Sequence, residues 1–346
     1  MTSVGIIGAS GFTGAELLRL CASHPSFDVR VATAESQVGV PLAELYPSLA
    51  GAYGDQAFVA TSPEAVDGLD LVFLGLPHGA SQALVPSLFG RVGAIVDLAA
   101  DFRLVDAGLY PEWYGEAHTC PELIPSLAYG LPELFRSDIV GASAVAAPGC
   151  YVTAASLALA PLLAAGLVEP TGIVVDAASG VSGAGRAPKA STAFCTVDED
   201  FTAYGLLSHR HTPEIEQNLA RVAGAEAQVL FTPHLAPMNR GILATCYARP
   251  TASGSVSTDD VLAVLRKAWA DEPFVVVVDG SPSTKATLGS NAVHVTARAD
   301  ERTGWVVAIA ALDNLTKGAS GQAVQCANLL CGLPEGEGLP IVGMYP

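Results

Sequence analysis

The chain has 346 residues, half of them apolar and only 15% charged, which allows two domains of ordinary size and excludes an intrinsically disordered chain. The formal net charge of −17 argues against nucleic-acid and anionic membrane partners, because both require a basic surface. In so acidic a chain, a phosphorylated ligand would need cations gathered locally, so each Arg or Lys near a motif carries information.

The N-terminus and the cysteines favour a cytoplasmic protein. We expect no targeting signal, since the first residues carry no basic region and lead straight into a strand-like segment. The longest apolar stretch, 154–168, is short and interrupted by Pro161, so it predicts no membrane span. Seven cysteines without a Cys-x-x-Cys pair favour reduced thiols over a disulfide framework or a zinc knuckle.

The first part of the chain predicts short buried strands that alternate with helices. Apolar runs bounded by Gly, Asp or Pro occur at 3–7, 29–32, 71–74, 94–96 and 143–147. A helical pattern with Leu17, Leu18 and Leu20 on its apolar side follows the first run. Continuous apolar strands separated by helices indicate a parallel sheet that is buried on both faces.

The pattern changes in the second part of the chain. Helices are expected at 154–165 and 259–269, and strands at 173–176, 228–232, 242–247, 274–278, 292–297 and 305–311. Several long strands with few helices between them indicate a mixed or antiparallel sheet. A last helical pattern, at 319–330, comes after the second sheet is finished.

The segment GASGFTG at 8–14 lies between the first strand and the first helix, and it predicts a phosphate-binding turn. Glycines let the backbone approach a pyrophosphate, and a helix start offers free N–H groups. The spacing is G-x-x-G-x-x-G rather than G-x-G-x-x-G, and the alternative is a plain strand-to-helix turn. Glu35 lies where a ribose-binding acid would favour NAD, whereas Ser36 and Thr33 could face a 2′-phosphate, so these residues leave the choice open.

The segment PGCYVT at 148–153 follows a strand and opens a helix. A thiol at a helix N-terminus is biased toward the thiolate, which is its reactive form. The alternative is a buried structural cysteine, which suits Cys21, Cys326 and Cys331 better because they lie in apolar helical patterns. The sequence therefore predicts Cys150 as a nucleophile.

The segment HRHTPE at 209–214 concentrates cations in an acidic protein. A histidine can shuttle protons, and Arg210 can pair with a carboxylate or a phosphate, although a solvated loop is the alternative. A lone His-x-His pair is weak evidence for a metal, so we predict no metal site. Arg103 follows the strand at 94–96 and is a further candidate for binding an anion.

These motifs occur in the order, and at about the spacing, of one family. The chain resembles the N-acetyl-gamma-glutamyl-phosphate reductases of arginine biosynthesis, relatives of aspartate-semialdehyde dehydrogenase, over nearly its whole length. The combination of PGCY with HRH-x-PE is specific to this family rather than to its aspartate relative. Val152, where the family often has proline, is a departure. Further matching segments are LPHG at 76–79, ADFR at 100–103, YGLPE at 129–133, SGVSGAGR at 179–186, FTPH at 231–234, RGIL at 240–243 and DNLTKG at 313–318.

The resemblance implies an α/β protein of two domains. An N-terminal Rossmann-type NADP-binding domain would span 1–147 and be joined by a C-terminal helix at 319–346, and an α/β substrate domain with a mixed sheet would span 148–318. NADP(H), a homodimer or homotetramer and a cytoplasmic location are implied as well. The expected cofactor contacts are Gly8, Ser10, Gly11, Phe12, Thr13, Gly14, Ser36 and Pro77, together with Ser182, Gly183 and Asn314 around the nicotinamide.

The resemblance also implies an activity, the NADPH-dependent reduction of N-acetyl-gamma-glutamyl phosphate to its semialdehyde. Cys150 would attack the acyl phosphate and expel phosphate, which leaves a thioester that can accept hydride. His211 is the expected acid/base and His209 is the second choice. The expected substrate contacts are Arg103 and Arg186 for the leaving phosphate, and Arg210 and Glu214 for the carboxylate and the amide.

Three other functions compete with this one. The nearest is reduction of another acyl phosphate on the same fold, such as aspartyl phosphate or a carrier-bound aminoadipyl or glutamyl phosphate. A Cys/His hydrolase would have no use for the nucleotide turn at 8–14. A protein that only senses nucleotides would not need Cys150 at a helix start.

Overall fold

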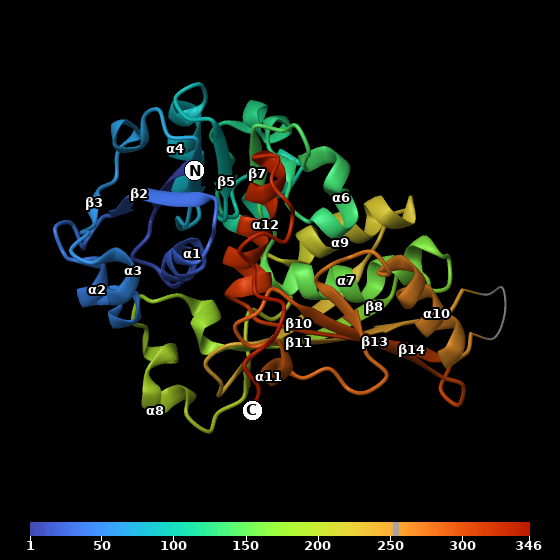
Figure 1. The fold of residues 1–346 in the computed structure, drawn as a ribbon. Helices are drawn as coiled ribbons and strands as arrows, with labels where there is room; N and C mark the ends of the chain where they lie inside the picture. The colour runs from blue at the N-terminus through green and yellow to red at the C-terminus, as the bar shows by residue number, and fades with distance from the viewer. Residues whose placement is uncertain (252–255) are drawn as a thin grey trace. The chain divides into compact units, whose positions relative to one another are not determined.

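The computed structural model describes residues 1–251 and 256–346, which fold into two compact units (Figure 1). The first unit comprises Met1–Pro148 and Ala319–Leu339, and the second comprises Gly149–Gly318 and Pro340–Pro346. Each unit is built around one seven-stranded sheet. Within the described residues, no helix is both long and apolar enough to cross a membrane.

The sheet of the first unit is parallel, as the apolar runs predict. Its strands lie in the order β3-β2-β1-β4-β5-β7-β6. They are β1 (Thr2–Ile7), β2 (Phe27–Ala34), β3 (Val59–Ala60), β4 (Leu71–Leu74), β5 (Ala94–Asp97), β6 (Ala128–Tyr129) and β7 (Ala144–Ala146). The order of connection reverses between β1 and β4, which is where open α/β sheets bind their ligands.

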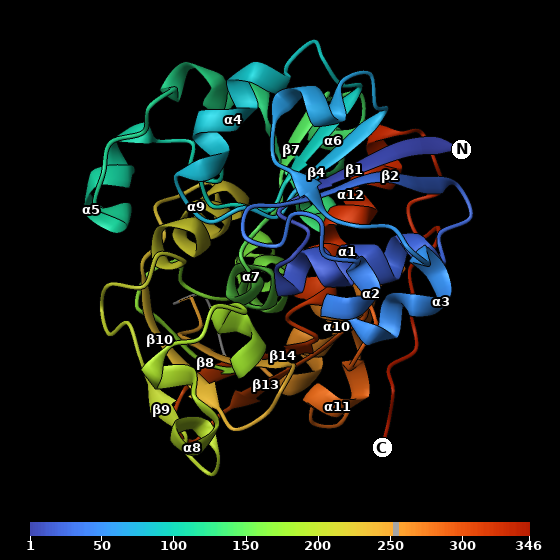
Figure 2. The same ribbon diagram turned by 90° about the vertical axis from the view of Figure 1, so that its left-hand side faces the viewer.

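Helices cover both faces of this sheet, which explains why β4 and β5 are buried along their whole length. Helices α1 and α12 pack together on one face, and α4 lies on the other (Figure 2). The helices of the unit are α1 (Phe12–Ala22), α2 (Leu42–Leu45), α3 (Ala50–Tyr53), α4 (Ala80–Leu88), α5 (Tyr110–Tyr114), α6 (Pro132–Ile139) and α12 (Gly321–Leu330). Short 3₁₀ turns fill the connections at Pro47–Leu49, Pro63–Val66, Ala107–Leu109 and Pro121–Ser126.

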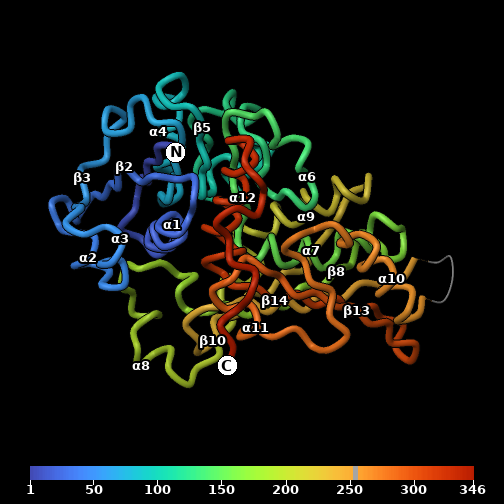
Figure 3. Tube along the Cα trace, in the orientation of Figure 1, coloured from blue at the N-terminus to red at the C-terminus, as the bar shows by residue number. Residues whose placement is uncertain are grey.

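The C-terminal segment returns to the first unit, where α12 packs against α1, α6 and β5 (Figure 3). The predicted helix over 319–346 is too long, since α12 ends at Leu330. The last residues, Pro340–Pro346, belong to the second unit instead. They are held there by backbone hydrogen bonds from Asn291 N–H to the Pro340 carbonyl (2.7 Å) and from Met344 N–H to the Leu288 carbonyl (2.8 Å).

The sheet of the second unit is mixed, which confirms the prediction. Its strands lie in the order β12-β13-β14-β11-β8-β10-β9. The pairs β8–β10 and β12–β13 are parallel, and the others are antiparallel. The strands are β8 (Ile173–Gly180), β9 (Thr202–Ala203), β10 (Val229–Ala236), β11 (Ile242–Ala248), β12 (Val275–Val277), β13 (Val293–Asp300) and β14 (Trp305–Leu312).

The central helix of the second unit is α7 (Cys150–Ala164), in which every residue from 151 to 163 is buried. It packs against β11 and β14 and against two neighbouring helices, α9 (Thr212–Ala223) and α10 (Thr258–Ala268). Because α7 is apolar on all sides, its position is fixed by packing rather than by a polar face. The shorter elements are α8 (Phe194–Val197), α11 (Thr284–Thr287), the 3₁₀ turns Val181–Ala184 and Ala190–Thr192, and the π-turn Thr316–Ser320.

Candidate active site

Cys150 is the first residue of α7, as the sequence predicts, and Gly149 is the N-cap of that helix. The thiol is partly exposed and lies at the positive end of the helix dipole, which favours the thiolate. A Cβ added to Gly318 would lie 2.9 Å from the Cβ of Cys150. Glycine at 318 therefore leaves the room that the thiol side chain occupies.

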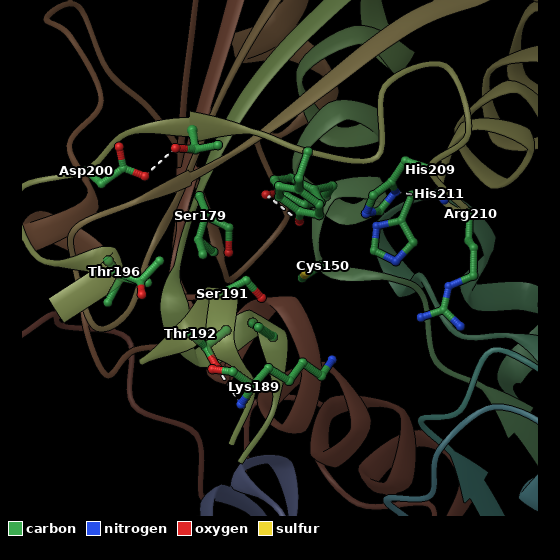
Figure 4. Close-up of a pocket in the computed structure, with 17 residues that line it drawn as sticks. Cys150, Ser179, Lys189, Ser191, Thr192, Thr196, Asp200, His209, Arg210 and His211 are labelled. Carbon is green, nitrogen blue, oxygen red and sulfur yellow. Dashed lines mark hydrogen bonds between the residues drawn. The ribbon is translucent and has the colours of Figure 1, made fainter. Parts of the chain in front are cut away.

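A cavity of about 560 Å³ opens beside Cys150 within the second unit (Figure 4). Among the residues predicted from sequence, those that line it are Cys150, Gly183, His209, Arg210 and His211. The other lining residues are Tyr151, Ser179, Ala184, Lys189, Ser191, Thr192, Thr196, Val197, Asp200, Thr202, Tyr204 and Leu235. Motif reading missed this second set because most of it lies on the irregular chain between β8 and α9, where no regular spacing identifies it.

His209 packs among aromatic rings. Its ring meets those of Tyr151 and Phe231 edge-on, with centroids 5.7 and 5.2 Å away. Burial, and then the charge of Arg210, lower the pKa of His209 to about 4, so the ring is neutral near pH 7. Its Nδ1 accepts the backbone N–H of His211 at 3.1 Å. His209 therefore braces the loop that carries Arg210 and His211.

His211 lies at the N-cap of α9, and its imidazole packs directly against Gly149. A Cβ at Gly149 would collide with Nε2 of this ring. Glycine at this position is therefore needed for the close approach of the imidazole to the start of α7. The contact brings His211 next to the residue that precedes Cys150, and both side chains line the same cavity. This placement is suited to a proton-transfer group.

Glu214 does not line the cavity, although the sequence suggests it as a substrate contact. Its side chain is fully buried, and Oε1 accepts the backbone N–H of Gly149 at 3.0 Å. The carboxylate thus binds one of the N–H groups at the start of α7, which no intrahelical carbonyl can satisfy. Glu214 links the first turn of α9 to the residue in front of Cys150.

Two tyrosines form a short hydrogen-bonded relay beside the thiol. The Tyr204 hydroxyl donates to that of Tyr151 at 3.1 Å, and Tyr151 donates to the carbonyl of His234 at 3.1 Å. Burial raises the pKa of Tyr204 to about 12, and it raises the pKa of Tyr151 further. Both phenols therefore stay protonated at neutral pH.

The cations predicted from sequence are divided between the two units. Arg210 lines the cavity, whereas Arg186, in the same unit, does not. Arg103 belongs to the first unit and is nearly buried, with its guanidinium donating to the Leu98 carbonyl at 2.6 Å. A cation that the sequence reading missed, Lys189, also lines the cavity.

Ser182 and Asn314, predicted to line a nicotinamide pocket, are buried and joined to each other. The Asn314 amide donates to the Ser182 hydroxyl at 3.0 Å and accepts the Gly241 N–H at 2.7 Å. Gly183 faces the cavity, and a Cβ there would lie 2.8 Å from Oγ of Ser179. The three predicted residues therefore meet, with Gly183 alone bordering the cavity.

In the first unit, the segment 8–14 forms the turn between β1 and α1. Gly8 has a φ of +76°, and a Cβ there would lie 2.5 Å from the Gly75 carbonyl oxygen. A Cβ at Gly14 would lie 2.5 Å from Cα of Ala9. Side chains at these positions would collide with neighbouring backbone, so the glycines let the turn pack tightly. With Ser10, Gly11, Phe12 and Thr13, this turn at a helix start fits a pyrophosphate cradle.

The ends of β2 and β4 flank this cradle. Glu35 and Ser36 follow β2 and are exposed, whereas Thr33 is buried, and its hydroxyl accepts the Gly8 N–H at 3.3 Å. Thr33 is thus an internal partner of the turn rather than a candidate for facing a 2′-phosphate. Pro77 follows β4, in a turn held by Asp101, whose carboxylate accepts the Gly79 N–H at 2.9 Å.

None of the seven cysteines forms a disulfide, and they differ in burial. Cys195 is exposed and does not line the cavity, while burial raises the pKa of Cys21 to about 12. The pKa values of Cys120 and Cys246 are raised by burial as well. In the part of the chain that the structure describes, no three His, Cys, Asp or Glu side chains are grouped to hold a metal ion.

Two family models together match most of the chain. A model described as "Semialdehyde dehydrogenase, NAD binding domain" matches residues 3–142, and one described as "Semialdehyde dehydrogenase, dimerisation domain" matches residues 150–314. Together they include the turn after β1 and the helix that begins at Cys150.

Individual proteins agree with these models. The chain is 50% identical to a protein of Symbiobacterium thermophilum and 47% identical to one of Citrifermentans bemidjiense, and both are named N-acetyl-gamma-glutamyl-phosphate reductase. The first comparison covers 99% of each chain, and the second covers 100% of each chain. The fold is similar to that of an aspartate semialdehyde dehydrogenase with NADP from Candida albicans, with a TM-score of 0.71, 16% identity and 96% and 98% of the two chains covered.

Proposed function

Because the chain belongs to the semialdehyde dehydrogenase family, and within it to the N-acetyl-gamma-glutamyl-phosphate reductases, we propose that it catalyses the reaction for which those relatives are named. NADPH would reduce N-acetyl-gamma-glutamyl phosphate to N-acetylglutamate 5-semialdehyde, with release of phosphate, as a step of arginine biosynthesis. The observation that carries this proposal is the thiol of Cys150, which starts a helix beside a cavity that two imidazoles and two cations also line.

Cys150 supplies the covalent step. Its thiolate attacks the acyl carbon, a carbon–sulfur bond forms, and the bond to the phosphate oxygen breaks with its electron pair going to phosphate. The resulting thioester is far easier to reduce than a free carboxylate, which is why a nucleophile is needed. The dipole of α7 favours the thiolate in this attack.

His211 is the acid/base group in this scheme. Its imidazole lies against Gly149, so it can take the thiol proton as Cys150 attacks and return a proton when the aldehyde leaves. His209 is neutral and engaged with the backbone N–H of His211, which suits a bracing role. Arg210 provides a planar cation for the α-carboxylate of the substrate.

The turn at 8–14 is the part of the first unit that fits a dinucleotide. Gly8 and Gly14 let this turn pack tightly, since a Cβ at either position would collide with neighbouring backbone, and the start of α1 offers N–H groups to a pyrophosphate. When bound, NADP(H) supplies the hydride that reduces the thioester. Ser36, exposed after β2, is the residue we assign to the 2′-phosphate, and Glu35 is its competitor.

We propose a reducing, cytoplasmic setting, because none of the seven cysteines forms a disulfide. We also propose that the protein is a homo-oligomer, either a dimer or a tetramer, because the matching family domain is described as a dimerisation domain. Sedimentation of the purified chain would give the oligomer size directly.

A coupled assay tests the proposed function. The enzyme is given N-acetylglutamyl phosphate or aspartyl phosphate, each with NADPH or NADH, and cofactor oxidation is followed. We expect turnover with the N-acetylated substrate and NADPH. Turnover with aspartyl phosphate alone would replace the substrate assignment, and a clear preference for NADH would mean that Glu35 binds the ribose hydroxyl.

A further inference from the structure

The proposed substrate has two anionic groups on either side of its reacting region. One is the phosphoryl group attached to the acyl carbon, and the other is the α-carboxylate at the far end of the side chain. In a chain with a net charge of −17, neither anion is held without a nearby cation. The cavity beside Cys150 therefore needs two separate cationic positions.

Two such positions exist on different flanks of the cavity. Of the described residues that line it, Lys189 and Arg210 are the only lysine and arginine. Figure 4 draws Lys189 with Ser191 and Thr192 on one flank and Arg210 with the two histidines on the other, with Cys150 between them in this view.

The Lys189 flank is suited to a phosphoryl group. Thr192 folds back on Lys189, since its Oγ1 accepts the Lys189 backbone N–H at 3.2 Å and donates to the Lys189 carbonyl at 3.3 Å. The Thr192 hydroxyl is thereby used within the turn, which keeps Lys189 next to Ser191. An ammonium group and a hydroxyl supply several donors, which matches the several acceptor oxygens of a phosphate.

The surroundings of Lys189 leave its charge available. Within the described part of the chain, no carboxylate is within ion-pair distance of Lys189; the lining acid Asp200 instead accepts a hydrogen bond from the Thr202 hydroxyl. In Figure 4, Asp200 lies on the opposite side of Ser179 from Lys189. Residues 187–191 are all exposed, so a released phosphate can pass from this flank into solvent.

The two flanks also differ in what the chemistry asks of them. The carboxylate must stay bound while the thioester is reduced, and Arg210 sits between two histidines of a braced loop. The phosphate must leave before reduction, and it departs with an added negative charge that a positioned cation stabilises. His211, on the Arg210 flank, serves the sulfur and the carbonyl oxygen and is not required by a phosphate leaving group.

We propose that Lys189, together with the hydroxyl of Ser191, binds the phosphoryl group of the acyl phosphate and stabilises the charge that develops as the carbon–oxygen bond breaks. This inference rests on the proposed function. It adds Lys189 to Arg103 and Arg186, the residues that the sequence predicts for this group, and it leaves Arg210 for the carboxylate.

The reverse reaction separates the two anions, because phosphate and the semialdehyde are then independent substrates. Initial rates are measured with N-acetylglutamate 5-semialdehyde, NADP⁺ and inorganic phosphate. For Lys189→Met, we expect the KM for phosphate to rise about 10- to 100-fold, with the KM for the semialdehyde within about twofold. For Arg210→Met, we expect the semialdehyde KM to rise instead.

Two further variants serve as controls. Lys189→Arg keeps a cation at the site and should retain most of the phosphate affinity. Lys267→Met removes an exposed lysine of α10 that does not line the cavity, and it should change neither KM. A semialdehyde KM that rises in Lys189→Met, or two unchanged KM values, overturns the inference, whereas an inactive wild-type enzyme overturns the proposed function instead.

Discussion

Two strand-to-helix turns of this chain each place the positive N-terminal end of a helix dipole at a candidate site, but for different purposes. The turn from β1 into α1, at 8–14, presents a glycine-rich helix start, with Gly8 at a φ of +76°. The turn from β7 into α7 places Cys150 on the first helical residue. We expect the first helix start to bind an anion that arrives with a ligand, whereas the second carries a thiol that the helix dipole biases toward its anion.

The difference lies in what surrounds each glycine. At Gly14 the neighbour is the backbone of Ala9, so the glycine brings two stretches of main chain together. At Gly149 the neighbour is the imidazole of His211, so the glycine brings a titratable side chain to the thiol. We infer that the group packed against the glycine decides whether a helix start binds a ligand or carries a reactive side chain.

The largest expected effect comes from removing the thiol of Cys150 from the second turn. Cys150→Ser should lower turnover by about 10⁴- to 10⁶-fold, because a hydroxyl stays protonated where a thiol ionises. Binding of NADP⁺, measured by fluorescence titration, should remain near that of the wild type. Cys195→Ser, at an exposed thiol outside the cavity, is the matched control, and substantial activity in Cys150→Ser would refute the covalent scheme.

The second prediction removes the imidazole of His211, which we assign as the proton-transfer partner of Cys150. His211→Ala should lower kcat by about 10²- to 10⁴-fold, as is typical for loss of a general acid/base, and His209→Ala should cost less. Gly149→Ala should reproduce part of the loss, since the new Cβ takes the space of the His211 ring while the backbone φ of −69° suits alanine. Steady-state kinetics of the three variants decide the roles, and a larger loss in His209→Ala would exchange them.

The first turn is tested by filling its glycine. Gly14→Ala should weaken NADP⁺ binding about tenfold or more and lower the free energy of unfolding by about 1–3 kcal/mol, because the added methyl presses on Ala9. Gly51→Ala, in helix α3 where an added Cβ meets nothing within 4 Å, should do neither. Calorimetric titration and urea unfolding give the two quantities, and wild-type cofactor affinity in Gly14→Ala would argue against the cradle.

The smallest effect concerns the charge state of the bracing histidine. The pKa of His209 is lowered to about 4, below its ordinary 6.5, so the unfolded chain takes up this proton at a higher pH than the folded one. The stability linked to His209 is therefore present above about pH 6.5 and is lost as the pH falls toward about 4. Between about pH 7 and about pH 5, wild type should lose about 1–2 kcal/mol more unfolding free energy than His209→Gln. The measurement is the free energy of unfolding as a function of pH for both proteins, and curves that run parallel would contradict this prediction.

The elements that sequence predicts well are those whose signal is local. The apolar runs of the first sheet, the glycines of 8–14 and the helix start at Cys150 each depend on neighbours a few residues away. The fold of each unit follows from these signals. The position of Cys150 at a helix start could be predicted for the same reason, and the dipole of α7 favours the thiolate there.

The remainder depends on partners that are distant in the chain. Glu214 binds the Gly149 N–H across 65 positions, which no spacing rule indicates, so its place behind the site could not be predicted. Lys189 lies on irregular chain, where neither period nor motif identifies a cavity wall. The return of Pro340–Pro346 to the second unit depends on two backbone hydrogen bonds that any residue could make.

The uneven burial of the seven thiols determines how the molecule meets electrophiles and oxidants. Cys21, Cys120 and Cys246 are shielded and held as protonated thiols, so alkylating reagents and peroxides reach them slowly. Cys150 is partly open and dipole-activated, and Cys195 is open without that activation. With Cys195 replaced, we expect a brief treatment with a mild alkylating agent to count the sites with an intact Cys150, and we expect oxidants to inactivate the enzyme first at this same thiol.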